Sequence, residues 1–243
     1  MKPYALLILA LFTFSLYAKD NPKEETSPSD FKRFQIGINI SPDVCFRTLK
    51  NVSAGSIGDY IIKIRKEDEI VKPSYTAGLN VAFNIKKFVG LETGVQYSNK
   101  GYQTKMEDLE FAYPNPNNPN KAKFIYNFHC IDIPIKANFT IGKKKVRFFT
   151  SVGLTTNIFI KATSTGVLVY SNHTKRETIP ISYNYKKVNI SPLISVGIDY
   201  KINSRMNLRV EPTFRYGVLK LMDTPITTYL YSGGLNISYY FGL

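Results

Sequence analysis

Polar and apolar residues alternate one by one along residues 207–216, which read Asn-Leu-Arg-Val-Glu-Pro-Thr-Phe-Arg-Tyr. A period of two residues predicts a β-strand whose two faces carry different side chains. The polar face would hold Arg209, Glu211 and Arg215, and the apolar face would hold Leu208 and Phe214. If the apolar face points inward, the protein is a soluble sandwich or a ligand-carrying barrel. If it points outward, the protein lies in a membrane with charges in its lumen.

The same alternation recurs along the chain and predicts eight strands, at residues 34–48, 74–85, 88–102, 123–141, 146–160, 186–201, 205–219 and 227–241. Long connections alternate with short ones. Residues 49–72 predict a long loop or a small hairpin, and residues 103–122 and 161–185 predict two further long loops. The tip at 113–120 is rich in Pro and Asn, which predicts a mobile loop because proline cannot donate to a ladder.

Three features favour an outward apolar face. Loop lengths alternate by side, as in outer-membrane barrels, and the strands exceed the usual length of about 5 or 6 residues. The polar face is also rich in small residues, which suits the narrow lumen of an eight-stranded barrel: Gly37, Gly94, Ser98, Ser151, Gly153, Ser191, Ser195, Gly197, Gly234 and Ser238. The sequence therefore predicts an all-β protein, an eight-stranded antiparallel up-and-down transmembrane β-barrel in the outer membrane.

Four acids and four bases share the predicted inward face: Glu92, Asp132, Asp199 and Glu211 with Lys136, Arg147, Arg209 and Arg215. Because an isolated buried charge costs several kcal/mol, these groups are expected to neutralise one another. The network would fill and stiffen the barrel, or alternatively form a proton path or ligand site.

The short turns are basic, with Lys86, Lys87, Lys143, Lys144, Lys145, Lys201 and Arg205 on the same predicted side as Lys32 and Arg33. At a periplasmic rim these residues would meet anionic lipid headgroups. Alternatively, lysine only keeps tight turns soluble.

The N-terminus predicts export. A basic residue, an apolar run and Ala18 indicate a signal peptide over residues 1–18, followed by a periplasmic lead-in at 19–33 and one barrel domain at 34–243. No later apolar run is long enough for a membrane helix. The formal charge of +14 would suit nucleic acid, but an exported protein makes that partner the poorer choice.

Several segments resemble the outer-membrane β-barrel domain common in Bacteroidota, often called PorT-like. The resemblance is carried by residues 90–102 (GLETGVQYSNKGY), 131–136 (IDIPIK) and 234–241 (GLNISYYF), and it spans nearly all of the mature chain. It implies the barrel fold and, through the family's namesake, a role accessory to type IX protein secretion. Such barrels usually end on an aromatic residue read by the barrel-assembly machinery, whereas Gly242 and Leu243 follow Phe241 here.

No catalytic constellation is found. His129 and His173 are the only histidines, and alternation places His129 on the opposite face from Cys130 and Asp132. Neither metal-ligand spacing nor a phosphate-binding glycine loop occurs, so no cofactor is expected. The leading interpretation is a non-enzymatic barrel with a structural, interaction or secretion-accessory role, whose partners are outer-membrane lipid, the assembly machinery and secretion or surface proteins that contact the long loops. The alternatives are a secreted or periplasmic soluble barrel carrying a lipophilic ligand, and a lipid-acting enzyme that depends on His129.

Overall fold

The computed structural model describes residues 32–53, 55–113, 115 and 117–243. The predicted signal peptide and most of the lead-in therefore lie outside the described residues and stay predictions. Eight long strands form the barrel: β1 (Phe34–Asn51), β3 (Lys72–Lys86), β4 (Val89–Thr104), β6 (Lys121–Ile141), β7 (Val146–Val169), β9 (Val188–Lys201), β10 (Met206–Tyr216) and β11 (Ile226–Gly242). Three short strands and one helix lie in the connections: α2 (Ser56–Asp68), β2 (Glu69–Ile70), β5 (Glu107–Asp108) and β8 (Thr174–Ile181).

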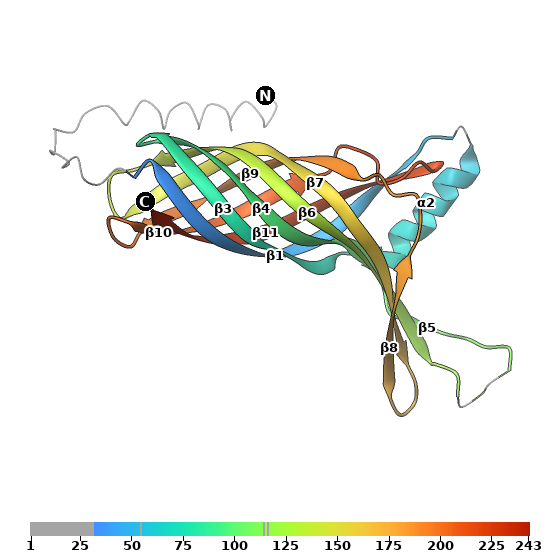
Figure 1. Ribbon diagram of the computed structural model, residues 1–243. Helices are drawn as coiled ribbons and strands as arrows, with labels where there is room; N and C mark the ends of the chain where they lie inside the picture. The colour runs from blue at the N-terminus through green and yellow to red at the C-terminus, as the bar shows by residue number, and fades with distance from the viewer. Residues whose placement is uncertain (1–31, 54, 114, 116) are drawn as a thin grey trace, which may run out of the picture. The chain divides into compact units, whose positions relative to one another are not determined.

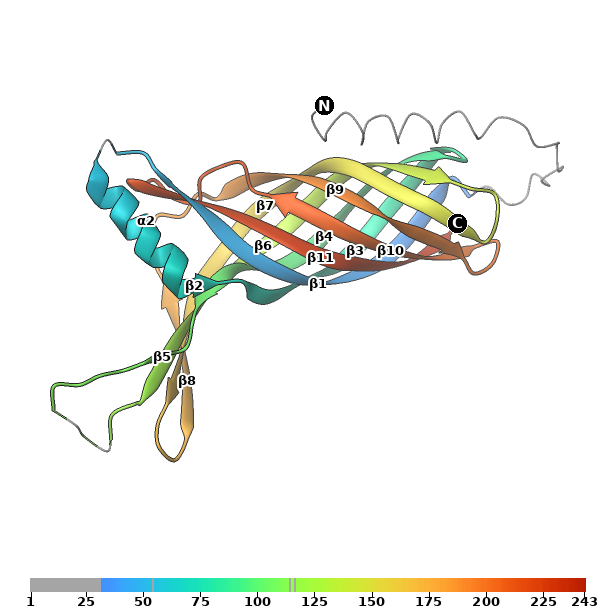
Figure 2. The ribbon, with the colours of Figure 1, turned by 180° about the vertical axis from the view of Figure 1, so that it is seen from behind.

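The long strands close into a ring in which every neighbour is antiparallel. The order is β4-β3-β1-β11-β10-β9-β7-β6, and pairing of β6 with β4 closes the circle. The first and last strands pair along their whole length, from Gln35 opposite Gly242 to Asn51 opposite Ile226. Figures 1 and 2 show the steeply inclined strands from two sides. Closure removes the free edges that an open sheet would expose, and the predicted eight-stranded up-and-down barrel is confirmed.

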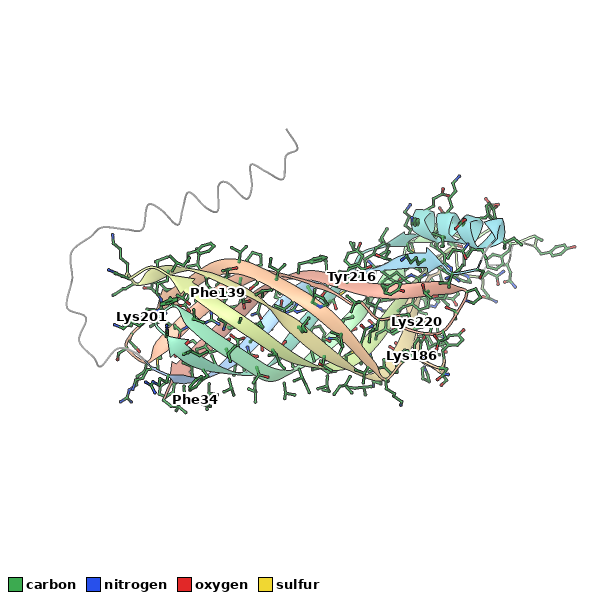
Figure 3. The ribbon with its side chains drawn as sticks, turned by 90° about the horizontal axis from the view of Figure 1, so that it is seen from above. Phe34, Phe139, Lys186, Lys201, Tyr216 and Lys220 are labelled. Carbon is green, nitrogen blue, oxygen red and sulfur yellow. The ribbon has the colours of Figure 1, made fainter. Side chains whose placement is uncertain are left out.

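The apolar face points outward. Ile38, Leu79 and Ile135 each keep about three-fifths of their surface exposed, at 60, 61 and 63%. Their polar strand neighbours Asn39, Asn80 and Lys136 are buried at 6% or less. Figure 3 shows the apolar side chains standing out from the barrel wall. The structure thus decides the question that residues 207–216 left open, and the interpretation as a soluble barrel with an apolar face turned inward is wrong.

Residues 49–72 contain α2 and β2, so the prediction of a loop or small hairpin there is wrong. Ile57, Tyr60, Ile61 and Ile64 recur at helical spacing. Asp59 in the first turn and basic residues in the last turn complement the helix dipole. The mixed charges of this stretch hid that pattern.

Residues 161–185 are also more ordered than predicted, because β7 continues to Val169 and pairs with β8. A register shift between β6 and β7 puts Lys161 opposite His129 but Phe159 opposite Cys130. One extra residue at this bulge reverses which side chains face inward. The simple alternation breaks at this bulge, where the predicted strand ended.

The connections separate by side. The short turns at 87–88, 142–145 and 202–205 share one end of the barrel with the C-terminal residues, and we call this the short-turn end. The helix α2, the connection at 105–120 and the β7–β8 hairpin lie at the other end, the long-loop end. No helix in the described part of the chain is long and apolar enough to cross a membrane.

Candidate functional site

A network of buried charges fills the barrel interior, and Glu92 lies near its middle. One carboxylate oxygen of Glu92 lies 2.7 Å from Nζ of Lys136, and the other lies 2.8 Å from the guanidinium of Arg209. Lys136 also lies 3.2 Å from the carboxylate of Glu211. The Asn138 amide donates a further bond of 2.7 Å to Glu92. Each buried acid therefore contacts a cation, as the cost of burying a lone charge requires.

The network extends toward the short-turn end through Asp199. Arg147 forms an ion pair with Asp199, and Arg209 approaches the same carboxylate to 3.5 Å. The side chain of Arg147 keeps 25% of its surface exposed, whereas that of Asp199 keeps 1%. Arg147 therefore lies at the mouth of the charged interior rather than deep within it.

Two further ion pairs lie on the long-loop side of this centre. Asp132 pairs with Lys100 at 3.1 Å, and Arg215 approaches Asp43 to 3.6 Å. Lys100 and Asp43 were not among the predicted lumen charges, although both continue the inward parity of their strands. Both lie within strands that the sequence predicts, at 34–48 and 88–102, so the alternation already pointed to them.

All eight predicted lumen charges thus face the interior, and with Asp43 and Lys100 they form a central network of five carboxylates and five cations: Asp43, Glu92, Asp132, Asp199, Glu211, Lys100, Lys136, Arg147, Arg209 and Arg215. Two aromatic rings brace the network. The guanidinium of Arg209 lies 3.8 Å from the ring centre of Phe149 and 4.6 Å from that of Tyr240. These ring contacts and the ion pairs together restrict the movement of this arginine.

The predicted basic turns all lie at the short-turn end: Lys86, Lys87, Lys143, Lys144, Lys145, Lys201 and Arg205. The turn at 142–145 begins with Gly142, whose φ of +125° suits glycine alone. Lys86 lies over the ring of Phe88 at 6.0 Å. Figure 3 shows both Lys201 and the aromatic Phe34 at this end.

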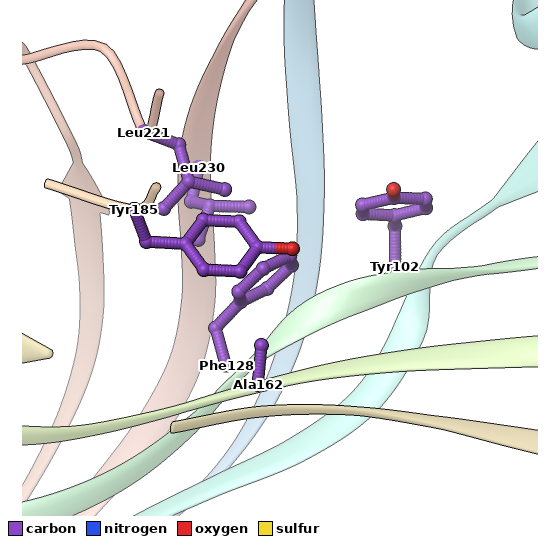
Figure 4. Packing of buried hydrophobic residues seen from close by; sticks show 6 residues of the cluster. All are labelled: Tyr102, Phe128, Ala162, Tyr185, Leu221 and Leu230. Atoms are coloured by element: carbon purple, nitrogen blue, oxygen red, sulfur yellow. The ribbon is translucent and has the colours of Figure 1, made fainter. Parts of the chain in front are cut away.

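The interior changes character at the long-loop end. Tyr102, Phe128, Ala162, Tyr185, Leu221 and Leu230 form a buried apolar cluster, shown in Figure 4. We call it the aromatic cluster. The rings of Phe128 and Tyr185 meet edge to face at 5.5 Å, and burial raises the pKa of Tyr185 to about 12. Sequence reasoning missed this cluster, although Tyr102 and Phe128 occupy inward-facing positions on β4 and β6.

A hollow of about 570 Å³ opens beside the aromatic cluster, between α2 and the loops. Its lining combines aromatic and aliphatic side chains with a few polar groups, among them Arg47, Arg65 and Glu69. Arg47 forms an ion pair with Glu69, and its guanidinium lies 3.6 Å from the ring centre of Tyr102. A mainly apolar hollow of this size with a few polar groups suits recognition of a ligand or of a partner's side chain.

Each of the two histidines contacts a tyrosine. His129 bonds to the hydroxyl of Tyr97 on the outer face of the barrel. His173 stacks on Tyr170 in the β7–β8 turn, with ring centres 4.5 Å apart. In the described residues, no group of three or more His, Cys, Asp or Glu side chains could hold a metal ion.

Comparison with known proteins identifies one protein family. A family model described as "Outer membrane protein beta-barrel domain" matches residues 32–223. The match covers the ring from β1 to β10, and the protein is accordingly located in the outer membrane. A search of curated proteins found no significant match.

Solved outer-membrane barrels are similar at low identity. Neisserial surface protein A shares 11% identity at a TM-score of 0.43, over 86% of this chain and 97% of that one. OprG from Pseudomonas aeruginosa shares 11% sequence identity at a TM-score of 0.44, over 89% of this chain and 100% of that chain. The outer membrane protease OmpT from Escherichia coli shares 9% sequence identity at a TM-score of 0.43, over 90% of this chain and 99% of that chain. Similarity at this level carries over none of their functions.

Proposed function

We propose that this chain, which belongs to the outer membrane protein beta-barrel domain family, is a non-conducting, non-enzymatic barrel that anchors a recognition surface in the outer membrane. The ion-paired interior is the observation that carries the proposal. Five acids and five bases neutralise one another across a lumen that eight strands make only just wide enough for side chains. Such a plug leaves the long-loop end, with α2 and the aromatic hollow, as the part available for partners.

The orientation belongs to the same proposal. Outer-membrane barrels carry short turns on the periplasmic side and long loops outside. We place the long-loop end outside the cell, and the basic residues of the short turns at the periplasmic rim, where they meet anionic headgroups. Strand β11, which pairs with β1 and carries Tyr239 and Phe241 near its C-terminal end, is the segment that we propose the barrel-assembly machinery recognises.

The partner we propose is a component of protein secretion or another surface protein. The resemblance to PorT-like domains of Bacteroidota supports an accessory role in type IX-like secretion. The long-loop end is suited to contact with a protein, because the side chains of Tyr113 and Tyr183 are exposed there at 87 and 69%. Exposed aromatic residues are enriched where proteins bind one another.

Conductance in a planar bilayer tests the closed lumen. The wild-type barrel should give no discrete current steps, because the charges are engaged with one another rather than with water and ions. Stable steps in the wild type would refute a closed barrel. Turnover of a lipid substrate that is lost in His129→Ala, with folding retained, would refute the non-enzymatic assignment.

Site-specific crosslinking in intact cells tests the partner. A photo-crosslinking residue at Tyr183 should capture a secretion or surface protein, whereas the same residue at Lys144 provides the matched control at the short-turn end. Deletion of the gene should also reduce surface delivery of secreted proteins. Equal capture of one protein from both ends, with normal secretion in the deletion strain, would contradict the assignment.

A further inference from the structure

The β7–β8 hairpin and its neighbours form a flat extension that we call the paddle: β5, β8, residues 121–128 of β6 and residues 162–169 of β7. Figures 1 and 2 show it leaving the barrel wall at the long-loop end and pointing away from the barrel axis. A strand that bends away from the axis turns its outward face back toward the lipid-facing wall. The outer face of the paddle and the barrel wall therefore form two sides of one crease.

A hollow of about 480 Å³ lies in this crease. Tyr75 and Asn99 line it from the barrel wall, and Lys123, Thr165 and Arg176 line it from the paddle. The register explains how they meet, because Lys123 lies opposite Val167 on β7, and Val167 lies opposite Arg176 on β8. Lys123 and Arg176 consequently share one face of the sheet.

The hollow carries positive charge without a matching acid. Lys72, Lys123 and Arg176 line it, and none of the described lining residues is Asp or Glu. No ion pair among the described residues includes Lys123 or Arg176. Their neighbour Lys175 differs, since it points to the opposite face and pairs with Glu177 at 3.2 Å. The crease therefore concentrates cations that the chain itself leaves uncompensated.

Lys72 is held in place within this crease. Its Nζ donates to the side-chain and backbone oxygens of Asn99, at 3.1 and 3.3 Å. It passes over Gly101, which has a φ of +148° and no side chain to obstruct it. A Cβ at Gly101 would lie 1.9 Å from the carbonyl oxygen of Tyr126 and 3.1 Å from Cε of Lys72, so the neighbouring backbone itself requires glycine here. Asn99 thus fixes the position of the Lys72 ammonium group and adds polar atoms to the lining of the hollow.

The crease lies at the edge of the lipid-facing band. Tyr75 and Tyr97 pack together at 6.0 Å beside it, and Tyr97 bonds His129. Aromatic side chains of this kind mark the interface between hydrocarbon and headgroups. Next to them the wall becomes apolar, with Leu79 and Val95 exposed at 61 and 57%. A hollow just beyond the aromatic residues is at headgroup level.

We propose that this crease binds the phosphate group of a lipid headgroup in the leaflet that surrounds the long-loop end. Charge complementarity selects a phosphate, since cations and amides line the site without an acid. The lipid-facing wall beside the crease selects a lipid as its source, because acyl chains can lie on Leu79 and Val95 while the headgroup lies in the hollow. The site is separate from the recognition surface proposed above.

Native mass spectrometry of the folded protein in detergent tests the site with two lipids that differ only in the phosphate. Dioleoyl phosphatidic acid should remain bound, and dioleoylglycerol should not. Lys123→Gln/Arg176→Gln should weaken phosphatidic acid binding on the order of 25-fold, at about fivefold for each cation. Lys123→Arg/Arg176→Lys keeps both charges and should bind like the wild type.

Lys175→Gln/Lys186→Gln is the matched control, because it removes two positive charges at the same end from residues that already pair with carboxylates. It should leave binding unchanged. Equal loss in both double variants would overturn the site, since net charge alone would then explain binding. Equal retention of both lipids, or competition by inorganic phosphate at concentrations equal to the lipid, would also overturn it. Partner crosslinking from Tyr183 should persist in Lys123→Gln/Arg176→Gln. The crosslinking result and the lipid-binding result therefore test the recognition surface and the phosphate site separately.

Discussion

The interior of this barrel consists of two regions with opposite chemistry. Around Glu92 the strands enclose ion pairs and amides, while around Phe128 the same strands enclose aromatic rings. The outer surface changes in parallel. Beside the charged interior the wall is apolar, whereas beside the aromatic cluster the outward-facing neighbours include the polar residues Gln103, Asn127 and Thr163. Position along the barrel axis therefore decides which side of a strand is apolar.

The physical reason is the surrounding solvent. Where lipid surrounds the barrel, apolar side chains are stable outside, and the interior must satisfy its polar groups internally. Where the strands leave the lipid, water surrounds them, and the ordinary hydrophobic effect drives aromatic side chains inward. The long strands β6 and β7, with 21 and 24 residues, run through both regions.

Removal of one central charge should give the largest effect. Glu92→Gln leaves Lys136 and Arg209 without their shared carboxylate, and we expect a loss of about 3–5 kcal/mol in the free energy of unfolding. Chemical denaturation in lipid vesicles measures it. Glu110→Gln, at an exposed position in the long-loop region, is the control and should stay within about 0.5 kcal/mol. Equal stability of the two variants would show that the ion pairs of the interior are not required for the stability of the barrel.

The aromatic region should respond locally. Phe128→Ala removes a ring that is 2% exposed, and we expect a loss of about 3 kcal/mol. Hydrogen exchange should rise in β8 and residues 217–225, while amides around Glu92 stay protected. Faster exchange throughout the barrel would show that the two regions unfold as one.

The stability cost of a new charge on the outer surface should depend on whether lipid or water surrounds that position. Ile135→Arg puts a charge on the lipid-facing wall, and we expect a loss of about 2–3 kcal/mol. Ile57→Arg on α2 introduces the same charge at a position that is 75% exposed, where water surrounds it, and should cost little. Comparable losses in vesicle-based unfolding of the two variants would argue against a lipid boundary between them.

The smallest effect concerns a loop contact at the long-loop end. Lys186 and Lys220 donate hydrogen bonds to Asp223 and hold the pKa of its carboxyl below the usual value. The contact is therefore complete above the usual pKa of aspartate, and it is lost as pH falls through the lowered folded value. Carboxyl NMR of Asp223 measures the midpoint. Lys186→Gln should move it upward, and Lys63→Gln should not; a midpoint unaffected by either change would contradict the contact.

The strands were predictable from the sequence because their signal is local. Alternation along 207–216 requires only that successive side chains point to opposite faces, and the same rule placed Glu92, Asp132 and Glu211 on the inner face. Loop-length asymmetry then indicated a membrane barrel. These inferences need no knowledge of which strands are neighbours.

The paired partners were not predictable, because they depend on which strands become neighbours and in what register. Arg215 meets Asp43, 172 positions earlier in the chain, only because β11 lies between β10 and β1. The helix α2 was missed because the mixed charges of residues 49–72 hid its apolar residues at helical spacing.

Residue order along single strands and loop lengths were therefore enough to predict the strand number, eight of the inward-facing charges and the outer-membrane location. Only the tertiary structure decided the change from a charged to an aromatic interior, the bulge at Phe159 and Lys161, and the crease between paddle and wall. Those features arise where strands distant in sequence bend, shift in register and approach one another. The order of residues along one strand does not predict these long-range contacts.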